Sequence, residues 1–332
     1  LERCHPHACV SPHGSNGVIR LFSMDLVGPC HDDPVKCFHS SALEIVDLAG
    51  VGKNAVTVKA KLHSYGTVAV KSIPIYREQE GDDVIQIPFE VLALASLHHH
   101  RIPKLIGVCV EDSEILIIQE FVRGPLKYLF SSDLWTILYR GSPRCQLLLP
   151  DLFQIIYDIA DALEYLHSCS ICHCDLTPKN ILVDEGFGAH IIDFGCSKRH
   201  PVDTREMHGK YVQGCVSYLA PEVLQGNKHS PKSDVYSLGV IITELLTQVK
   251  PWDGYTDGAI EHAVCNQGKN VWCMNNENAQ LGCPLTKTLN KRTRKLLNKL
   301  MLKLLATGAD GRPSAACVKA DVAEIRKLVD KC

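Results

Sequence analysis

The hydrophobic period of this chain changes from strand-like to helical near Gly124-Pro125. Before that point the sequence forms short alternating apolar runs, and beyond it apolar residues recur at helical spacing over long segments. The expected strands are 43–48, 56–62, 67–73, 104–110 and 114–121, and the expected helices are 88–97, 152–166, 234–246 and 291–305. A strand-rich half followed by a helix-rich half predicts an α+β protein with two lobes, the first built on a sheet of about five strands.

The composition is that of an ordinary globular protein. The 332 residues are 45% hydrophobic and 22% charged, with a formal net charge of -2. A balance this close to neutrality gives no long-range attraction to nucleic acid or to an anionic membrane. The longest apolar runs, such as 115–118 and 238–242, are too short to cross a bilayer, and no secretory signal opens the sequence at Leu1. We therefore expect neither nucleic-acid binding nor a membrane span.

The chain contains 16 cysteines, an even number that would allow a disulfide framework. Many of them lie in strongly apolar or motif segments, as reduced core cysteines do. Examples are Cys109, Cys169, Cys172, Cys174 and Cys196. The sequence also lacks any Asn-x-Ser/Thr glycosylation site. These features favour a reducing setting, which is the cytoplasm or the nucleus.

Residues 1–42 lack a sustained hydrophobic period and are rich in His, Cys, Pro and Gly. We interpret them as an irregular extension that precedes the folded domain. Their cysteines allow an alternative, since Cys4, Cys9, Cys30 and Cys37 could hold Zn2+ in a tetrahedral site. The spacings match no common zinc motif, so an extension without metal is the favoured interpretation.

Two polar segments stand next to short apolar runs in the second half of the chain. The first is His173-Cys174-Asp175-Leu176-Thr177-Pro178-Lys179-Asn180, and the second is Asp193-Phe194-Gly195. The carboxylate of Asp175 could orient a hydroxyl group, and the side-chain oxygens of Asn180 and Asp193 suit a divalent cation. The plainer alternative is that Asp175 and Asn180 only form turn hydrogen bonds. The presence of two such loops favours a catalytic site.

These segments resemble the catalytic loop and the metal-binding loop of eukaryotic protein kinases, with His-Cys-Asp in place of His-Arg-Asp. Further motifs follow in the order of that family: Gly50-Val51-Gly52, Val68-Ala69-Val70-Lys71, Glu90, Ala220-Pro221-Glu222, Asp234 and Gly311-Arg312-Pro313. The resemblance implies a kinase domain over 43–330, with a small sheet lobe containing helix C at 43–120, a hinge at 120–124 and a larger helical lobe at 125–330. It also implies that Asp234 braces the catalytic loop and that Glu222 pairs with Arg312.

The resemblance further implies that the chain uses ATP and Mg2+ and that its substrate is a protein. Its catalytic residues would be Asp175, Lys179, Lys71 and Glu90, with Lys71 and Glu90 forming an ion pair that orients the nucleotide phosphates. Asn180 and Asp193 would hold the metal. The nucleotide would lie against Gly50, Gly52, Ala55, Ala69, Lys71, Gln119, Glu120, Val122 and Leu182.

The sequence departs from the family pattern at Cys174 and Thr177. Cys174 replaces an Arg that, in the family, binds a phosphate group of the activation segment. We therefore expect activity without phosphorylation of Thr204 or Tyr211. Thr177 replaces the Lys that Ser/Thr kinases place near the transferred phosphoryl group. Lys179 follows shortly after it and could supply the missing charge.

Two functions fit this pattern. The first is an active ATP–Mg2+ protein kinase directed to Ser/Thr, as Pro178 and Tyr218 indicate, with tyrosine specificity left open. The alternative is a pseudokinase that serves as a nucleotide-binding scaffold; it is supported by Thr57, Gln119, Pro125, Cys174 and Thr177. Because Lys71, Asp175 and Asp193 are all kept, the enzyme is the favoured hypothesis. The pattern predicts no oligomeric state.

Overall fold

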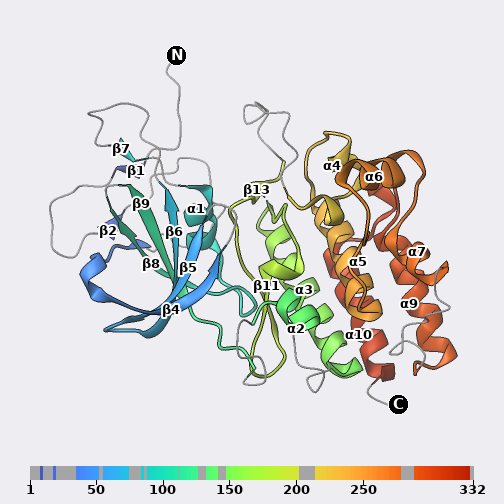
Figure 1. Ribbon diagram of the computed structural model, residues 1–332, viewed down its shortest axis with the longest axis horizontal. Helices are drawn as coiled ribbons and strands as arrows, with labels where there is room; N and C mark the ends of the chain where they lie inside the picture. Colours follow the sequence, from blue (N-terminus) through green and yellow to red (C-terminus); the bar gives the residue numbers. More distant parts are fainter. Residues whose placement is uncertain are drawn as a thin grey trace. The chain divides into compact units, whose positions relative to one another are not determined.

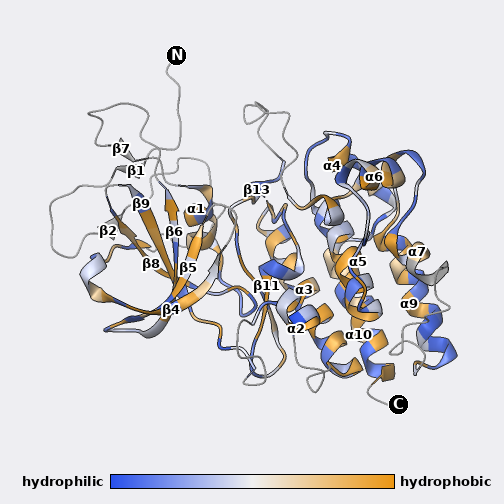
Figure 2. Cartoon of the chain, viewed as in Figure 1, coloured by the Kyte–Doolittle hydropathy of each residue, from blue (hydrophilic) through white to orange (hydrophobic). Residues whose placement is uncertain are grey.

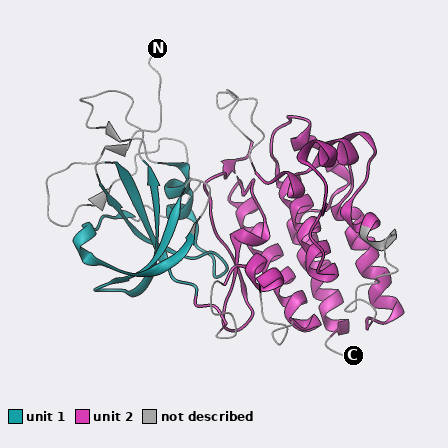
Figure 3. Cartoon of the chain, viewed as in Figure 1, with its two compact units in different colours: residues 1–122 teal, residues 123–332 magenta. Residues whose placement is uncertain are grey.

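The computed structural model describes residues 8–9, 18–19, 35–51, 55–74, 84–85, 88–111, 113–125, 132–140, 147–201, 214–277 and 288–329. The chain divides into two compact units, residues 1–122 and 123–332 (Figure 3). Strands dominate the first unit and helices dominate the second (Figure 1). The predicted α+β fold, with a sheet-based N-terminal lobe and a helical C-terminal lobe, is confirmed.

Unit 1 is built on an antiparallel sheet of five strands in the order β4-β5-β6-β9-β8. The strands are β4 (Leu43–Val51), β5 (Val56–Leu62), β6 (Gly66–Pro74), β8 (Leu105–Val110) and β9 (Glu114–Glu120). Each coincides with an expected run, because β-branched and apolar residues alternate there as a half-buried strand requires. The helix α1 (Phe89–Ser96) carries Glu90 in its first turn.

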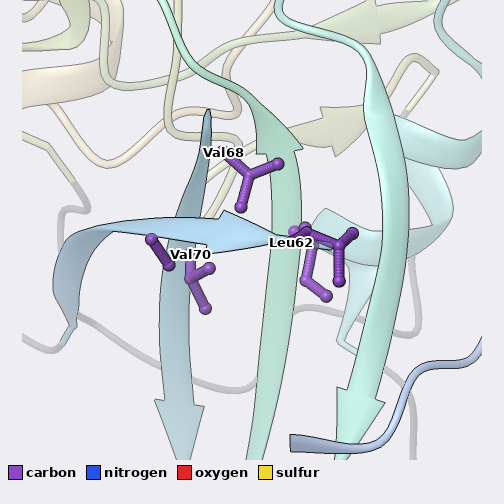
Figure 4. Close-up of a cluster of buried hydrophobic side chains, with 5 residues drawn as sticks. Leu62, Val68 and Val70 are labelled. Atoms are coloured by element: carbon purple, nitrogen blue, oxygen red, sulfur yellow. The ribbon is translucent and has the colours of Figure 1, made fainter. Parts of the chain in front are cut away.

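One face of this sheet buries a compact apolar cluster (Figure 4). Ala60, Leu62, Val68, Val70 and Ile118 are each at most 3% exposed. The strands that carry them are largely apolar (Figure 2). Because side chains alternate along a strand, burial of Val68 and Val70 turns their neighbours on β6 toward the other face. The cluster therefore fixes the register of the strand that presents Lys71.

The segment that immediately precedes the sheet packs on it. β3 (Val35–Lys36) lies against β8, and the backbone N–H of Phe38 donates to the carbonyl of Val108 at 2.8 Å. A Cβ at Gly107 would overlap the Phe38 ring, so this close approach requires glycine. A 3-10 turn, η1 (Ser40–Ala42), then leads into β4. The last part of the expected extension thus contributes to unit 1.

Two further strand pairs lie in unit 1. β1 (Ala8–Cys9) pairs with β7 (Val84–Ile85), and β2 (Val18–Ile19) pairs with β3. Cys37, one candidate for the zinc site, is a free and half-buried thiol. Cys4 and Cys30 lie outside the described residues, so the zinc alternative stays a prediction.

Unit 2 is organised around α5 (Pro231–Thr247), whose residues 233–246 are all buried. A nearly all-apolar helix predicts this burial. α3 (Leu149–Ser168) packs against α5 and α10 (Ala315–Val329), and α9 (Lys291–Leu304) also contacts α5 and α10. Across the described ranges, no helix is both long enough and apolar enough to cross a membrane.

Short elements on this framework carry the polar segments. β10 (Ile171–Cys172) pairs with β13 (Lys198–Arg199), and β11 (Ile181–Val183) pairs with β12 (Ala189–Ile191). Residues 173–180, named here the Asp175 loop, connect β10 to β11 and end in the 3-10 turn η2 (Pro178–Asn180). The other elements are α2 (Leu134–Arg140), η4 (Val216–Tyr218), α4 (Pro221–Leu224), α6 (Asp257–Glu261), the π-helix η5 (His262–Asn266), α7 (Val271–Glu277) and η7 (Ala309–Gly311).

Candidate active site

Unit 1 holds a buried ion pair between two of the predicted residues. Lys71 on β6 places its Nζ 2.6 Å from Oε1 and 2.9 Å from Oε2 of Glu90 on α1. The Lys71 and Glu90 side chains are only 13% and 3% exposed, so solvent ions screen the pair weakly. Glu90 needs such a partner because an uncompensated buried carboxylate is costly. The pair therefore fixes the position of the ammonium group beside the sheet.

Three other predicted nucleotide-binding residues lie on neighbouring strands. Ala69 on β6 pairs with Gln119 on β9. The Gln119 side chain donates from Nε2 to the carbonyl of Pro103 at 3.3 Å, which supplies the partner that a polar group requires there. Glu120 ends β9, and its carboxylate accepts the backbone N–H of Lys104 at 3.1 Å. The sheet therefore brings Ala69, Gln119 and Glu120 together at one end of β9.

The predicted glycine turn lies at the β4–β5 connection. Gly50 is exposed and pairs with Thr57, and Ala55 immediately precedes β5. Gly52 lies outside the described residues, and Val122 is the last residue of unit 1. The part these positions play in nucleotide binding stays a prediction.

In unit 2, Asp234 at the start of α5 holds the Asp175 loop. Its Oδ2 accepts the backbone N–H of His173 at 2.9 Å, and its Oδ1 accepts that of Cys174 at 3.0 Å. His167 on α3 donates from Nε2 to the same carboxylate at 2.9 Å. Burial alone would raise the pKa of Asp234, but the bond from His167, nearby His173 and the N–H of Cys174 outweigh it and lower that pKa. The predicted brace is confirmed.

The carboxylate of Asp175 is held by two weaker contacts. Asn180 donates from Nδ2 to Asp175 Oδ2 at 3.1 Å and to its backbone carbonyl at 2.8 Å. The backbone N–H of Cys215 donates to Oδ1 at 3.2 Å. Burial raises the pKa of Asp175, and the negative charge of Asp193 adds to that effect, while His173 and the two donors oppose it without cancelling it. An under-compensated carboxylate of this kind is poised to accept a proton.

The second polar segment lies beside the first. The N–H of Ile192 donates to the carbonyl of Asn180 at 3.0 Å, which joins the two loops at their roots. Asp193 adopts a left-handed φ of 66°, and its Oδ1 accepts the N–H of Gly195 at 3.2 Å. Because the Asn180 amide nitrogen is used by Asp175, the amide oxygen is the atom that can bind a cation. The structure thus brings Asp175, Asn180 and Asp193 together as one oxygen-rich group.

His173 and Phe194 supply the apolar support of these loops. The Nε2 of His173 donates to the carbonyl of Ile192 at 3.0 Å, and its ring centroid lies 5.3 Å from that of the fully buried Phe194. Leu182 lies at the centre of β11, half-buried between Ile181 and Val183, which are fully buried. The hairpin therefore turns Leu182 away from the core face that its two neighbours occupy.

The two positions of the Asp175 loop that depart from the family pattern are both buried. Cys174 is 3% exposed and has a left-handed φ of 67°. Burial, together with the negative charge of Asp234, raises the pKa of its thiol, so no charge stands at this position. Thr177 is 7% exposed and caps η2 without a side-chain hydrogen bond to its backbone. Thr204 and Tyr211, whose phosphorylation the sequence predicts to be unnecessary for activity, lie outside the described residues.

Lys179, predicted to replace the missing Lys, is exposed and lies over an aromatic ring. Its Nζ is 5.2 Å from the ring centroid of Trp135 on α2. No motif predicts this contact, because it depends on how α2 packs against η2. Burial raises the pKa of the Cys215 thiol, and the charge of Lys179 opposes this effect. Lys179 is therefore close to the segment that contacts Asp175.

The segment after residue 213 contributes a contact that the motifs did not reveal. Gly214 has a φ of 106°, and a Cβ there would lie 3.1 Å from the carbonyl of Cys174. Glycine thus lets the backbone approach closely enough for Cys215 to reach Asp175. Farther on, Arg312 donates from both terminal nitrogens to Glu222, each at 2.7 Å, which confirms the predicted pair. Arg312 is fully buried, so the pair anchors α4 firmly.

Comparisons with known proteins agree with this arrangement. A family model described as protein kinase domain matches residues 43–321. Wall-associated receptor kinase-like 18 of Arabidopsis thaliana is 35% identical over 209 residues, 61% of this chain and 25% of that protein. Calcium/calmodulin-regulated receptor-like kinase 2 of the same plant is 35% identical over 189 residues, 56% and 41% of the two chains. A G-type lectin S-receptor-like serine/threonine-protein kinase of that plant is 32% identical over 204 residues, 60% and 24%. The matched region spans less than half of each relative.

Proposed function

The chain belongs to the protein kinase family, and on that premise we propose that it transfers the γ-phosphoryl group of ATP to a hydroxyl group of a protein substrate. The observation that supports this most directly is the environment of Asp175. Its carboxylate is oriented by Asn180 and Cys215, and its pKa is raised by burial and by Asp193. A carboxylate so placed accepts a hydrogen bond from the acceptor hydroxyl and takes up its proton as the phosphoryl group transfers.

The residues beside Asp175 fit a divalent cation. Asn180 offers an amide oxygen and Asp193 a carboxylate, and oxygen is the ligand atom that Mg2+ takes. Asn180 and Asp193 would hold this ion, and it would supply positive charge that neutralises part of the phosphate charge. The hydrogen bond from Ile192 to Asn180 keeps the two ligand side chains on adjacent backbone segments. Mg2+ is therefore the proposed metal.

Lys71 is the proposed phosphate ligand in unit 1. Its ammonium group is held by both oxygens of Glu90 and donates to them, which aims the charge and prevents the side chain from sampling other rotamers. Such preorganised positive charge stabilises phosphate oxygens without reorganisation during the reaction. This pairing supports nucleotide binding by the active form.

We propose Ser and Thr as the acceptors. One relative is named a serine/threonine-protein kinase, and Pro178 and Tyr218 occupy positions typical of that class. The cysteines from Cys37 onward whose side chains the structure describes are free thiols, which supports the cytoplasm as the compartment where this domain acts. Phosphoamino-acid analysis of a phosphorylated substrate would separate Ser/Thr from Tyr specificity.

The decisive experiment measures phosphoryl transfer from labelled ATP–Mg2+ to a mixed peptide library. Asp175→Asn keeps the size of the side chain but removes the base, so the rate should fall by about a thousandfold. Asp310→Asn, which neutralises an exposed carboxylate of η7 in the same unit, is the matched control and should keep the wild-type rate. Equal background rates for wild type and Asp175→Asn would reject the enzyme. Nucleotide binding without transfer would instead support the pseudokinase.

A further inference from the structure

Three exposed cations surround one aromatic side chain of unit 2. Lys179 Nζ, the Arg140 guanidinium carbon and Lys250 Nζ lie 5.2, 5.3 and 5.9 Å from the ring centroid of Trp135. Lys250 also lies 5.3 Å from the ring of Tyr139. We name Lys179, Arg140 and Lys250 the basic face. They come from η2, the end of α2 and the segment after α5, three separate parts of the chain.

The basic face lies next to the proposed catalytic group. α2 packs against η2, and the N–H of Val183 donates to the carbonyl of Ser132 at 2.8 Å just before α2. Lys179 belongs to the Asp175 loop, and its charge acts on Cys215, whose N–H binds the Asp175 carboxylate. A peptide that presents a hydroxyl to Asp175 therefore passes close to Lys179.

A buried carboxylate holds this surface in place. Glu244 on α5 accepts the hydroxyl of Tyr139 at 2.6 Å and that of Tyr218 at 2.7 Å. Tyr139 lies on α2 and Tyr218 in η4, so Glu244 ties the helix of the basic face to the segment that follows Cys215. These two hydrogen bonds hold α2 and η4 to α5, and preorganised presentation of charge favours selective docking.

No ion pair within the described residues neutralises the charge of the basic face. Within the described parts of the chain, none of its three cations lies within salt-bridge distance of a carboxylate. Nearby acids are the buried Glu244, which is occupied by two hydroxyls, and the exposed Asp253. Contact with the face of a ring leaves the N–H donors of a cation available to an anion. The formal charge of the whole chain is -2, so this positive surface is local.

We propose that the basic face binds acidic side chains of the protein substrate beside the phosphoacceptor, so that the kinase selects sequences rich in Asp and Glu. The proposal rests on the proposed phosphoryl-transfer function and names its substrate class. Lys179 and Arg140 offer donors to carboxylates on either side of Trp135, and Lys250 extends the surface along the adjoining segment. Charge complementarity of this kind raises the association rate and selects among partners more than it adds affinity.

The test uses two peptides with one Ser acceptor, flanked by Asp and Glu in the first and by Asn and Gln in the second. Wild type should phosphorylate the acidic peptide with a kcat/KM about tenfold higher, as expected of a few exposed charge contacts. The preference should shrink when the ionic strength is raised, because exposed charges are screened. Double variant Arg140→Gln/Lys250→Gln should bring the ratio of the two kcat/KM values close to one.

The control variant is Lys291→Gln/Arg294→Gln, which removes the same charge from exposed positions on α9. It should keep the wild-type preference, so the effect cannot come from net charge alone. Fluorescence anisotropy of labelled peptides on the Asp175→Asn protein gives a second readout that needs no turnover. There the acidic peptide should bind about tenfold more tightly than the neutral one.

The outcomes separate the two proposals. Phosphorylation of both peptides at equal rates would overturn the acidic preference and leave the kinase function standing. A preference that survives in Arg140→Gln/Lys250→Gln would also overturn the assignment to the basic face. Absence of transfer to every peptide would reject the kinase function, and the acidic preference with it. A single-stranded oligonucleotide that displaced the labelled acidic peptide at a lower concentration than the unlabelled acidic peptide does would assign the surface to nucleic acid instead.

Discussion

The Asp175 loop and the first turn of α5 each place one aspartate in unit 2, and the two carboxylates are shifted in opposite directions. Asp234 accepts two backbone N–H groups and a histidine N–H, and its pKa is lowered despite complete burial. Burial, together with the charge of Asp193, raises the pKa of Asp175, which accepts only longer bonds from Asn180 and Cys215.

The difference shows what separates a structural carboxylate from a reactive one. Around Asp234 the protein supplies enough donors to compensate the ionised form, so this residue acts as a fixed support. Around Asp175 the compensation is incomplete, so the ionised form stays ready to accept a hydrogen bond or a proton. Both residues are aspartate; they differ in the number and length of the hydrogen bonds they accept, and in the negative charge of Asp193 that acts on Asp175.

The largest expected effect on stability comes from Asp234→Asn. The new amide nitrogen would face an N–H donor, which leaves a buried N–H of the Asp175 loop without an acceptor. We expect a loss of about 3 kcal/mol in the free energy of unfolding, measured by urea titration monitored by circular dichroism. Phosphoryl transfer should fall as well, because the loop that carries Asp175 loses its anchor.

Asp175→Asn is the matched control for this loss, since it makes the same chemical change a short distance away. We expect its free energy of unfolding to equal that of wild type or to exceed it slightly, because an under-compensated carboxylate is removed. A destabilisation of Asp175→Asn as large as that of Asp234→Asn would contradict the contrast between the two sites.

The pH dependence of unfolding should distinguish the two carboxylates by sign. Because the pKa of Asp234 is lowered by folding, its stabilising contribution is present above the unfolded pKa of about 4 and is lost as the pH falls through the folded value. The stability gap between wild type and Asp234→Asn should therefore narrow in acid. The pKa of Asp175 is raised by folding, so its cost is absent in acid and develops as the pH rises through the folded value.

Urea titrations of wild type and both variants between neutral pH and a pH of about 2, which lies below the unfolded pKa of Asp, would check this prediction. The small advantage expected for Asp175→Asn at neutral pH should disappear in acid, at the same time as the deficit of Asp234→Asn decreases. The opposite signs would be refuted if both variants gained on wild type, or both lost, as the pH is lowered.

Most of the fold follows from hydrophobic periodicity, and one helix with a clear periodic pattern is absent from the expected set. The five strands and the helices α1, α3, α5 and α9 lie where apolar runs place them. α10 was not expected, although Val318, Val322, Ile325 and Val329 recur at helical spacing and are all buried. α2 is a shorter case, because seven residues give too few turns for a period to be evident.

The site was predictable where side-chain chemistry is local in sequence and unpredictable where it depends on the backbone. Asp175, Asn180 and Asp193 stand out because their spacing matches a family pattern. The contact from Cys215 to Asp175 crosses 40 positions and uses a backbone N–H, which every residue except proline has. The stacking of Lys179 on Trp135 depends on the docking of α2, which no pattern in the sequence specifies.

The smallest expected effect comes from Cys174, where the brace by Asp234 uses the backbone N–H and not the side chain. Cys174→Ala removes a buried sulfur but keeps that N–H, so it should cost about 1 kcal/mol and leave the phosphoryl-transfer rate close to wild type. Cys174→Gly should recover part of this cost, because glycine adopts the left-handed φ of 67° without strain. The measurement is urea unfolding of both variants beside Asp234→Asn. A loss in Cys174→Ala as large as that in Asp234→Asn would mean that the loop depends on the Cys174 thiol. The backbone N–H of Cys174 would then not be sufficient for the support that Asp234 gives to the loop.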